Sequence, residues 1–238
     1  MGAHTVAKSA EFVEARRELT SVLASAERRC LIWLARRLPP WINSDHLTAL
    51  ALASMFMAGA SFWAARVNRL SLLAVVFWLA VNWFGDSLDG TLARVRHQQR
   101  PRYGFYVDHI VDCFGVVVLV AGLAASGFMS PLVAMALLVA YLMLSIEVYL
   151  ATYCLTVFKI SFWGVGPTEL RILLAVGTIR LWSDPIVEIM GREFQLFDVG
   201  GVVAIATITM TLLISTLRNV RALYLAEPVP QPFGGAST

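Results

Sequence analysis

Charged residues are scarce in this chain. Only 15% of its 238 residues are Asp, Glu, Lys or Arg, whereas 58% are hydrophobic, and the mean hydropathy is +0.69. Such a chain is too apolar for a soluble domain and too long for a single anchor. Several nearly uncharged runs approach the roughly 20 residues that a membrane-crossing helix needs. The composition therefore predicts an all-α integral membrane protein, surrounded by membrane lipid and without a nucleic-acid partner.

Cysteine is also rare. Cys30, Cys113 and Cys154 form no CxxC pair and no disulfide framework, so we expect packing residues or free thiols. An opening apolar run is missing too, because residues 1–30 mix acids with bases. We therefore expect no cleavable signal peptide.

The apolar runs predict six transmembrane helices preceded by an amphipathic segment. From Ser9 to Arg37, apolar residues are interrupted by arginines, which predicts a helix that lies in the membrane interface or packs on protein beside it. Pro39 and Pro40 end this helix, and Ser44 or Asp45 is expected to cap the next. The six spans are expected at about 46–66, 70–94, 104–126, 131–158, 168–190 and 197–221. These elements predict three regions: a cytoplasmic or interfacial segment over 1–45, a six-span domain over 46–223 and a disordered tail over 224–238.

The basic residues predict the orientation. If the N-terminus is inside, 15 of the 19 Lys and Arg residues lie on the inner side and 4 on the outer side. Cytoplasmic loops accumulate such residues. Both termini and the loop between the second and third spans are therefore expected in the cytoplasm.

The stretch from Asp86 to Asp112 concentrates acids in this apolar chain. Asp86 and Asp89 share one helical stripe, and Asp108 and Asp112 share a second. The nine residues Val95 to Tyr103 separate the stripes, which predicts a hairpin of antiparallel helices with facing carboxylates. Gly90, Ala93 and Arg94 continue the first stripe, Gly104 begins the second, and Asn82 is a polar neighbour one turn before the acids. Gly90 leaves room for a close helix approach or a ligand.

Four facing carboxylates need compensating charge. At about 4 Å and an effective dielectric near 20, each like-charged pair costs about 4 kcal/mol. All-oxygen ligands without His or Cys favour Mg²⁺, Mn²⁺ or Ca²⁺ over zinc. Two such ions would balance four acids and could bridge a pyrophosphate, with Arg94 adding a bidentate grip. A single intramembrane Asp is more often a helix contact or proton relay, and a cation- or proton-coupled transporter is the alternative function for the set.

These residues carry a family resemblance. The pattern Asp-x-x-Asp-Gly-x-x-Ala-Arg, nine residues, then Gly-x-x-x-Asp-x-x-x-Asp resembles the signature of the CDP-alcohol phosphotransferase (phosphatidyltransferase) family at all eight positions. The segment before the first span, PWINSDHLT, is also similar to that family. The resemblance implies an enzyme that moves a substituted phosphate from a CDP-linked donor to an alcohol, releases CMP and uses two Mg²⁺ or Mn²⁺ ions.

The resemblance also implies residue roles and partners. Asp86, Asp89 and Asp108 would bind metal, and Asp112 would bind metal and act as the general base. Gly90, Ala93, Arg94 and Gly104 would border the CDP moiety. The acceptor would be diacylglycerol for a CDP-amino-alcohol donor, or a small alcohol for CDP-diacylglycerol. A homodimer is implied as well.

Three further positions bear on the branch of the family. His109 and the segment Gly166-Pro167-Thr168-Glu169 resemble the choline/ethanolamine branch, and Glu147-Val148-Tyr149 is similar to its Glu-x-Tyr-His-Thr stretch. Leu150 and Ala151 replace the His and Thr of that stretch. His109, Glu147 and Glu169 are therefore candidate site residues, and Glu169 is equally expected to favour a helix N-terminus.

Overall fold

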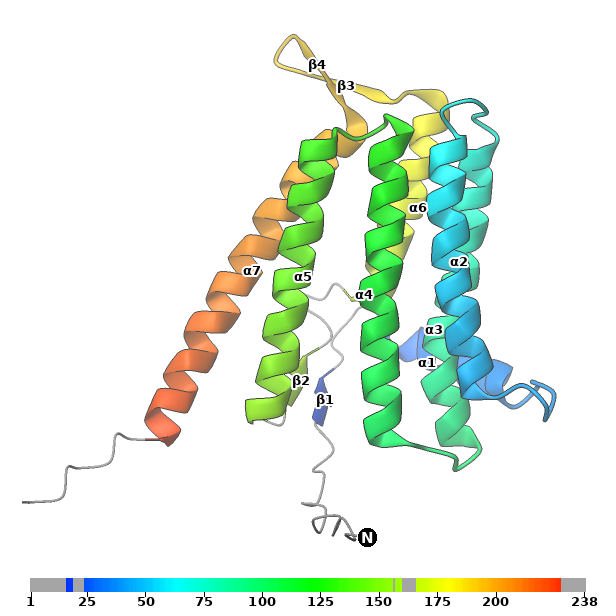
Figure 1. Ribbon diagram of the computed structural model, residues 1–238, viewed down its shortest axis with the longest axis vertical. Coiled ribbons are helices and arrows are strands. Elements are labelled where there is room, and N and C mark those ends of the chain that lie inside the picture. The colour runs from blue at the N-terminus through cyan, green and yellow to red at the C-terminus, as the bar shows by residue number, and fades with distance from the viewer. Residues whose placement is uncertain (1–15, 19–23, 156, 160–165, 228–238) are drawn as a thin grey trace, which may run out of the picture.

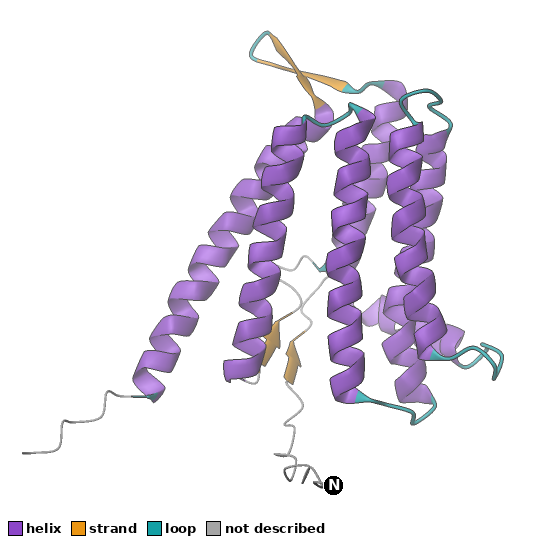
Figure 2. Cartoon of the chain, viewed as in Figure 1, coloured by secondary structure: helices purple, strands orange, loops and turns teal. Residues whose placement is uncertain are grey.

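The computed structural model describes all residues except 1–15, 19–23, 156, 160–165 and 228–238 (Figure 1). The described part is built mainly of helices, with four short strands, as Figure 2 shows by colour. The helices are α1 (Ala24–Ala35), α2 (Ser44–Ala64), α3 (Ser71–Val95), α4 (Pro101–Ser126), α5 (Pro131–Leu155), α6 (Pro167–Ser183) and α7 (Leu196–Ala226). The strands are β1 (Arg16–Glu18), β2 (Val157–Lys159), β3 (Ile186–Ile189) and β4 (Arg192–Gln195).

Five of these helices, α2, α3, α4, α5 and α7, are long and apolar enough to cross a membrane. Their many exposed apolar side chains are consistent with an integral membrane protein. The sixth predicted span corresponds to α6, which has 17 residues and is not among the five. At 1.5 Å per residue its length is about 25 Å, somewhat less than the roughly 30 Å of a bilayer's hydrocarbon core.

Helix α2 packs against both α3 and α4. Small residues allow the close approach: a side chain at Gly122 of α4 would place its Cβ 2.1 Å from the Gly59 carbonyl oxygen of α2. At Gly85 of α3, the Cβ would lie 2.6 Å from the Leu47 carbonyl oxygen. Small residues at helix contacts are typical of membrane proteins. Helix α2 therefore contacts both helices of the hairpin that the sequence predicts.

The remaining helices pack around this group. Helix α5 packs chiefly on α7, while α6 and α1 pack on α3 (Figure 1). A small apolar cluster holds α1 against the start of α2 and the end of α3. Its buried members are Leu31, Ala35, Leu47, Leu88 and Leu92.

The structure corrects the N-terminal prediction. Arg16–Glu18 belongs to a strand that pairs in parallel with Val157–Lys159, and the described helix covers only Ala24–Ala35. A continuous helix from Ser9 to Arg37 is therefore wrong. The pairing also ends the fourth predicted span earlier, since α5 stops at Leu155 and the predicted residues 157–158 belong to β2. The predicted tail falls partly on α7, which continues to Ala226, and residues 228–238 lie outside the described residues.

The fifth predicted span is too long at its C-terminal end. Helix α6 stops at Ser183, because Pro185 cannot continue the hydrogen-bond ladder and disfavours helical backbone at Asp184. The chain then forms the antiparallel β3–β4 hairpin instead of helix. Met190 and Gly191 form its turn with positive φ values of 53° and 77°.

Two predicted helix starts also differ. Helix α2 is capped by Asn43, whose side chain accepts from the His46 backbone N–H at 2.9 Å, and not by Ser44 or Asp45. Helix α4 starts at Pro101, three residues before the predicted start. Proline suits the first helical turn, where its missing N–H would have no partner within the helix.

Candidate active site

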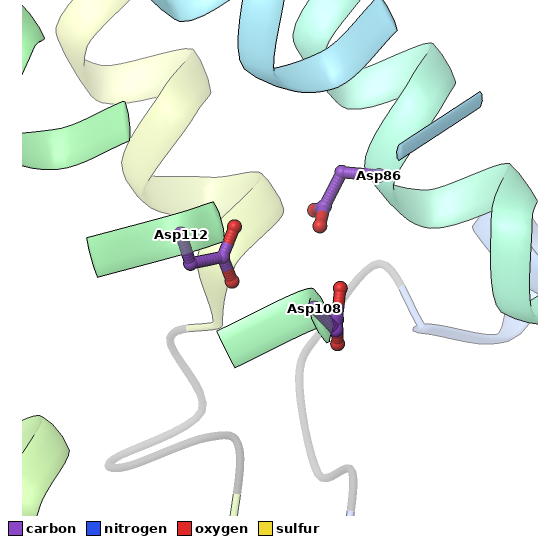
Figure 3. A group of neighbouring side chains, drawn as sticks. All are labelled: Asp86, Asp108 and Asp112. Atoms are coloured by element: carbon purple, nitrogen blue, oxygen red, sulfur yellow. The ribbon is translucent and has the colours of Figure 1, made fainter. Parts of the chain in front are cut away.

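Three carboxylates meet between α3 and α4. Asp86 of α3 and Asp108 and Asp112 of α4 each offer an oxygen within 4.8 Å of the others, and Figure 3 shows them turned toward one another. We call these three residues the acidic cluster. All three are partly buried. The structure therefore confirms that acids from the two predicted stripes face each other.

Helix positions explain why these three acids meet. Counted from the loop between α3 and α4 at 1.5 Å per residue, Asp86 lies about 13.5 Å from the end of α3. Asp108 and Asp112 lie about 10.5 and 16.5 Å from the start of α4. The depth of Asp86 along its helix thus lies between the depths of Asp108 and Asp112.

Asp89 is absent from the acidic cluster and faces a different neighbour. Its Oδ2 accepts a hydrogen bond from Thr48 Oγ1 of α2 at 2.6 Å, and its Oδ1 accepts from the Gly90 backbone N–H at 2.5 Å. Residues three apart in an α-helix are offset by about 60° around its axis. This offset turns Asp89 toward α2 while Asp86 faces α4 and α6.

A cation that the sequence analysis did not assign to the site contacts the acidic cluster. Arg171 of α6 donates from Nη2 to Asp86 Oδ2 at 2.5 Å, and both side chains are only 17% exposed. Its Nη1 is buried and has no hydrogen-bond partner among the described residues. Sequence reasoning counted Arg171 only as a topology charge. Its position in the first turn of an expected helix, two residues after the segment Gly166-Pro167-Thr168-Glu169 that resembles the choline/ethanolamine branch, is the signal that could have found it.

Glu27 of α1 is a second residue that the sequence analysis missed. Its Oε1 accepts hydrogen bonds from Trp83 Nε1 at 2.7 Å, Ser87 Oγ at 3.3 Å and Thr168 Oγ1 at 2.7 Å. One carboxylate oxygen thus connects α1 to the helices that carry Asp86 and Arg171. The sequence offers no local signal for this contact, because a Glu in an amphipathic helix is expected to be an exposed surface charge.

The residues expected around the nucleotide lie on the two helices beside the acidic cluster. The Arg94 guanidinium passes over Gly90, where an added Cβ would lie 3.4 Å from Nη1, and Arg94 donates to Thr91 Oγ1 at 3.0 Å. The room left by Gly90 is therefore used by Arg94 and not by another helix. Ala93 is partly exposed, and the space around Gly104 is open.

The other candidate residues have defined partners. Asn82 is buried and donates to the Ala51 carbonyl of α2 at 3.1 Å, so it forms a helix contact. Glu169 accepts from the Gly166 backbone N–H at 2.9 Å and caps α6, with Gly166 and not Thr168 at the N-cap position. Glu147 of α5 accepts from Ser215 and Asn219 of α7.

His109 lies beside the acidic cluster in an aromatic group. Its ring stacks on Phe105 with centroids 4.1 Å apart, and it meets Tyr149 edge-on at 4.8 Å. Its Nδ1 is 2.7 Å from the Phe105 carbonyl oxygen and 3.7 Å from Asp108 Oδ2. His109 therefore lies where it can affect the environment of Asp108.

In the loop between α3 and α4, Arg100 pairs with Asp45 at 2.5 Å. This hydrogen bond raises the pKa of Arg100 above its ordinary value. The neighbouring Arg96 donates to the carbonyl oxygens of Leu38, Pro39, Pro40 and Ile42. The loop between α3 and α4 is thus fastened to the segment between α1 and α2.

Five helices of membrane-crossing length and a cluster of carboxylates between α3 and α4 are consistent with an integral membrane protein that has an acidic site. A sequence model of the CDP-alcohol phosphatidyltransferase family matches residues 41–217, which is most of the chain, and the chain belongs to this family. A comparison with curated proteins finds no match. Membership indicates a transferase of substituted phosphate groups in phospholipid synthesis, with a CDP-alcohol donor and an alcohol or lipid acceptor.

Proposed function

We propose that the chain transfers a substituted phosphate from a CDP-linked donor to a hydroxyl acceptor at the acidic cluster and releases CMP. The observation that carries this proposal is the convergence of Asp86, Asp108 and Asp112 beside Arg171. The family of the chain supports the reaction class.

The acidic cluster fits hard divalent ions. Its oxygens lie within 4.8 Å of one another, and carboxylate oxygens without His or Cys are ligands that Mg²⁺ and Mn²⁺ accept. Asp86, Asp108 and Asp112 would hold the ions, two in number, with Asp89 as a fourth ligand in exchange for its bond to Thr48. The ions would neutralise the pyrophosphate and the charge that develops on departing CMP.

Asp112 is proposed as the general base. It is the acid farthest from the α3–α4 loop, so it lies on the side of the cluster where a lipid acceptor would reach from the bilayer. Its carboxylate would take the proton from the acceptor hydroxyl as that oxygen attacks the phosphorus farther from cytidine. The bond between this phosphorus and the bridging oxygen breaks, and CMP leaves with that oxygen.

The loop side of the site is proposed to bind the nucleotide. Gly90, Ala93, Arg94 and Gly104 lie on the two helices near their loop ends, where a water-soluble group can enter. The guanidinium of Arg94 lies over Gly90 and can bind phosphate oxygens through two N–H groups. The loop end is proposed to face the cytoplasm because of the 15 to 4 distribution of basic residues.

The remaining membrane arrangement is also a proposal. Helix α6 would serve as a sixth, short span of a functional domain over 46–223, and α1 would lie in the membrane interface before that domain.

The family resemblance suggests a homodimer. Among donors, His109 and the Gly166–Glu169 segment favour a CDP-amino-alcohol with diacylglycerol as acceptor, over CDP-diacylglycerol with a small alcohol. The transporter alternative is not favoured, because the family to which the chain belongs consists of phosphate-group transferases.

The test is a CMP-release assay on purified protein with Mg²⁺. Each donor class is supplied with its matching acceptor, and we expect CMP from one of the two. Asp112→Asn should abolish this release while retaining CDP binding, because the amide cannot accept the hydroxyl proton. Absence of CMP with both donor classes would contradict the enzyme assignment, and wild-type turnover by Asp112→Asn would remove Asp112 as the base.

A further inference from the structure

Arg171 holds an unusual position for a basic residue in this chain. It reaches from α6 into the acidic cluster, where Nη2 donates to Asp86 Oδ2 at 2.5 Å. Nη1 is buried without a hydrogen-bond partner among the described residues. A guanidinium stays charged at all accessible pH values and has five N–H donors, so a buried unsatisfied nitrogen is costly. The Arg171 side chain is thus held by its ion pair with Asp86, while the described residues leave part of its hydrogen-bonding capacity unused.

Arg171 and a divalent metal ion would compete for the same carboxylates, because both carry positive charge. Ionised Asp86, Asp108 and Asp112 carry three negative charges, and the guanidinium offsets one of them. A divalent ion bound to Asp86 would lie close to the guanidinium, and the two like charges would repel each other. Full occupancy by metal therefore requires Arg171 to give up Asp86 or to gain another anion.

A phosphate group is the anion that would release Arg171. Guanidinium binds phosphate oxygens through two parallel N–H groups, and the buried Nη1 is already available for a second bond. Helix α6 itself is held at its start by Thr168, which donates to Glu27, and by the Glu169 cap. A change of partner by Arg171 therefore needs rotation of its long side chain and not movement of the helix.

We infer that Arg171 is a resident counter-cation that competes with divalent metal for Asp86 and shifts to the phosphates of the nucleotide donor when that donor binds. This inference rests on the proposed function. It makes Arg171 a residue that couples metal binding to nucleotide binding: each ligand strengthens the other by the same factor, as thermodynamic linkage requires. The enzyme thereby binds metal firmly only when its substrate is present.

The test measures Mn²⁺ binding to the full-length protein in detergent by electron paramagnetic resonance, with and without CDP as the nucleotide probe. In the wild type, CDP should strengthen Mn²⁺ binding. Arg171→Gln should bind Mn²⁺ about tenfold more tightly without CDP, because the competing charge is gone, and should show a smaller effect of CDP. Arg171→Lys keeps the charge but not the planar fork, so its affinity without CDP should stay near the wild type while the CDP effect falls.

Arg180→Gln is the matched control. Arg180 lies on the same helix and pairs with Asp184 at 3.2 Å, but this pair is exposed and lies at the opposite end of α6. Its loss should leave both Mn²⁺ binding and the CDP effect unchanged. Melting temperatures in detergent identify any variant that fails to fold, and Arg171→Lys tests the coupling if Arg171→Gln is lost in this way.

The outcomes separate the two proposals. If the wild type binds Mn²⁺ but Arg171→Gln binds it equally or more weakly without CDP, Arg171 does not compete for Asp86 and the inference fails alone. An undiminished CDP effect in Arg171→Lys would overturn the coupling. If the wild type binds no Mn²⁺ with or without CDP, the proposed function fails and the inference with it.

Discussion

Among the groups of polar side chains that lie between the helices, two balance their charge in different ways. The acidic cluster combines three carboxylates with one guanidinium. The second group, which we call the α5–α7 contact, comprises Glu147, Ser215 and Asn219. Glu147 Oε1 accepts from Ser215 Oγ at 2.9 Å and from Asn219 Nδ2 at 2.6 Å.

The difference distinguishes a reaction site from a structural contact. In the α5–α7 contact, neutral donors satisfy one carboxylate oxygen, and the helices that carry the groups pack on each other. In the acidic cluster, Asp86 pairs with the guanidinium of Arg171, whose buried Nη1 has no partner among the described residues. Buried charge of one sign is unfavourable unless a ligand compensates it. A buried charged group that its neighbours leave partly unsatisfied is thus a better sign of function here than the presence of an acid in an apolar helix.

The largest expected effect is on CMP release, which should depend on the acidic cluster and not on the α5–α7 contact. Asp86→Asn should lower CMP release by at least about a hundredfold, since it removes both a proposed metal ligand and the partner of Arg171. Glu147→Gln keeps an oxygen acceptor for Ser215 and Asn219, so its turnover should stay within about threefold of the wild type. Parallel assays of both variants measure the contrast. Equal losses would show that Glu147 belongs to the reaction site.

Removal of metal ions should affect the acidic cluster and not the α5–α7 contact. We expect a chelator to abolish CMP release and added Mg²⁺ or Mn²⁺ to restore it, because the acidic cluster has hard oxygen ligands. Glu147→Gln should show the same Mg²⁺ dependence as the wild type, whereas Asp108→Asn should require more Mg²⁺. Undiminished activity after thorough chelation would exclude the proposed ions.

In the presence of chelator, substitutions in the acidic cluster and in the α5–α7 contact should change the free energy of unfolding in opposite directions. Asp108→Asn relieves repulsion between neighbouring acids and should raise the melting temperature by a few degrees, about 1 kcal/mol at this chain length. Glu147→Leu leaves Ser215 and Asn219 without their acceptor and should lower stability by about 1–2 kcal/mol. Thermal unfolding in detergent measures both. A lower melting temperature for Asp108→Asn would mean that its contacts within the protein outweigh the repulsion.

The smallest expected effect concerns Glu27, whose carboxylate resembles Glu147 in its neutral donors but lies beside the acidic cluster. Glu27→Gln should weaken the bonds from Trp83, Ser87 and Thr168 and lower turnover by less than about tenfold, since α1 would hold α3 and α6 less firmly. Indole fluorescence compared with Trp83→Phe reports the lost contact. Glu188→Gln in the β3–β4 hairpin is the control and should change neither property.

Local patterns predicted much of the fold. Hydropathy located the five long helices to within a few residues, except that α7 extends farther than predicted at its C-terminal end. The prediction was wrong where local and long-range preferences compete. Arg16–Glu18 pairs with a strand about 140 residues later, and the apolar stretch after Pro185 forms a hairpin because a proline interrupts a hydrophobic run.

The candidate site was predicted less completely. Spacing along two helices predicted facing acids, and Asp86, Asp108 and Asp112 confirm it. The same spacing could not separate Asp86 from Asp89, because the two differ by only about 60° around the helix and their neighbours decide the outcome. Arg171 is 85 residues from its partner Asp86, and Glu27 is 141 residues from Thr168.

Helix period and hydropathy act over neighbouring residues, so the amino-acid order alone established a helical membrane protein with acids concentrated at one hairpin. The packing of α1, α2 and α6 around α3 decided which acids meet and which one turns to Thr48. It also decided that the distant Arg171 and Glu27 complete the site. Packing directions arise from the shapes of whole helix surfaces, such as the close approach at Gly59 and Gly122. No short stretch of sequence contains that information.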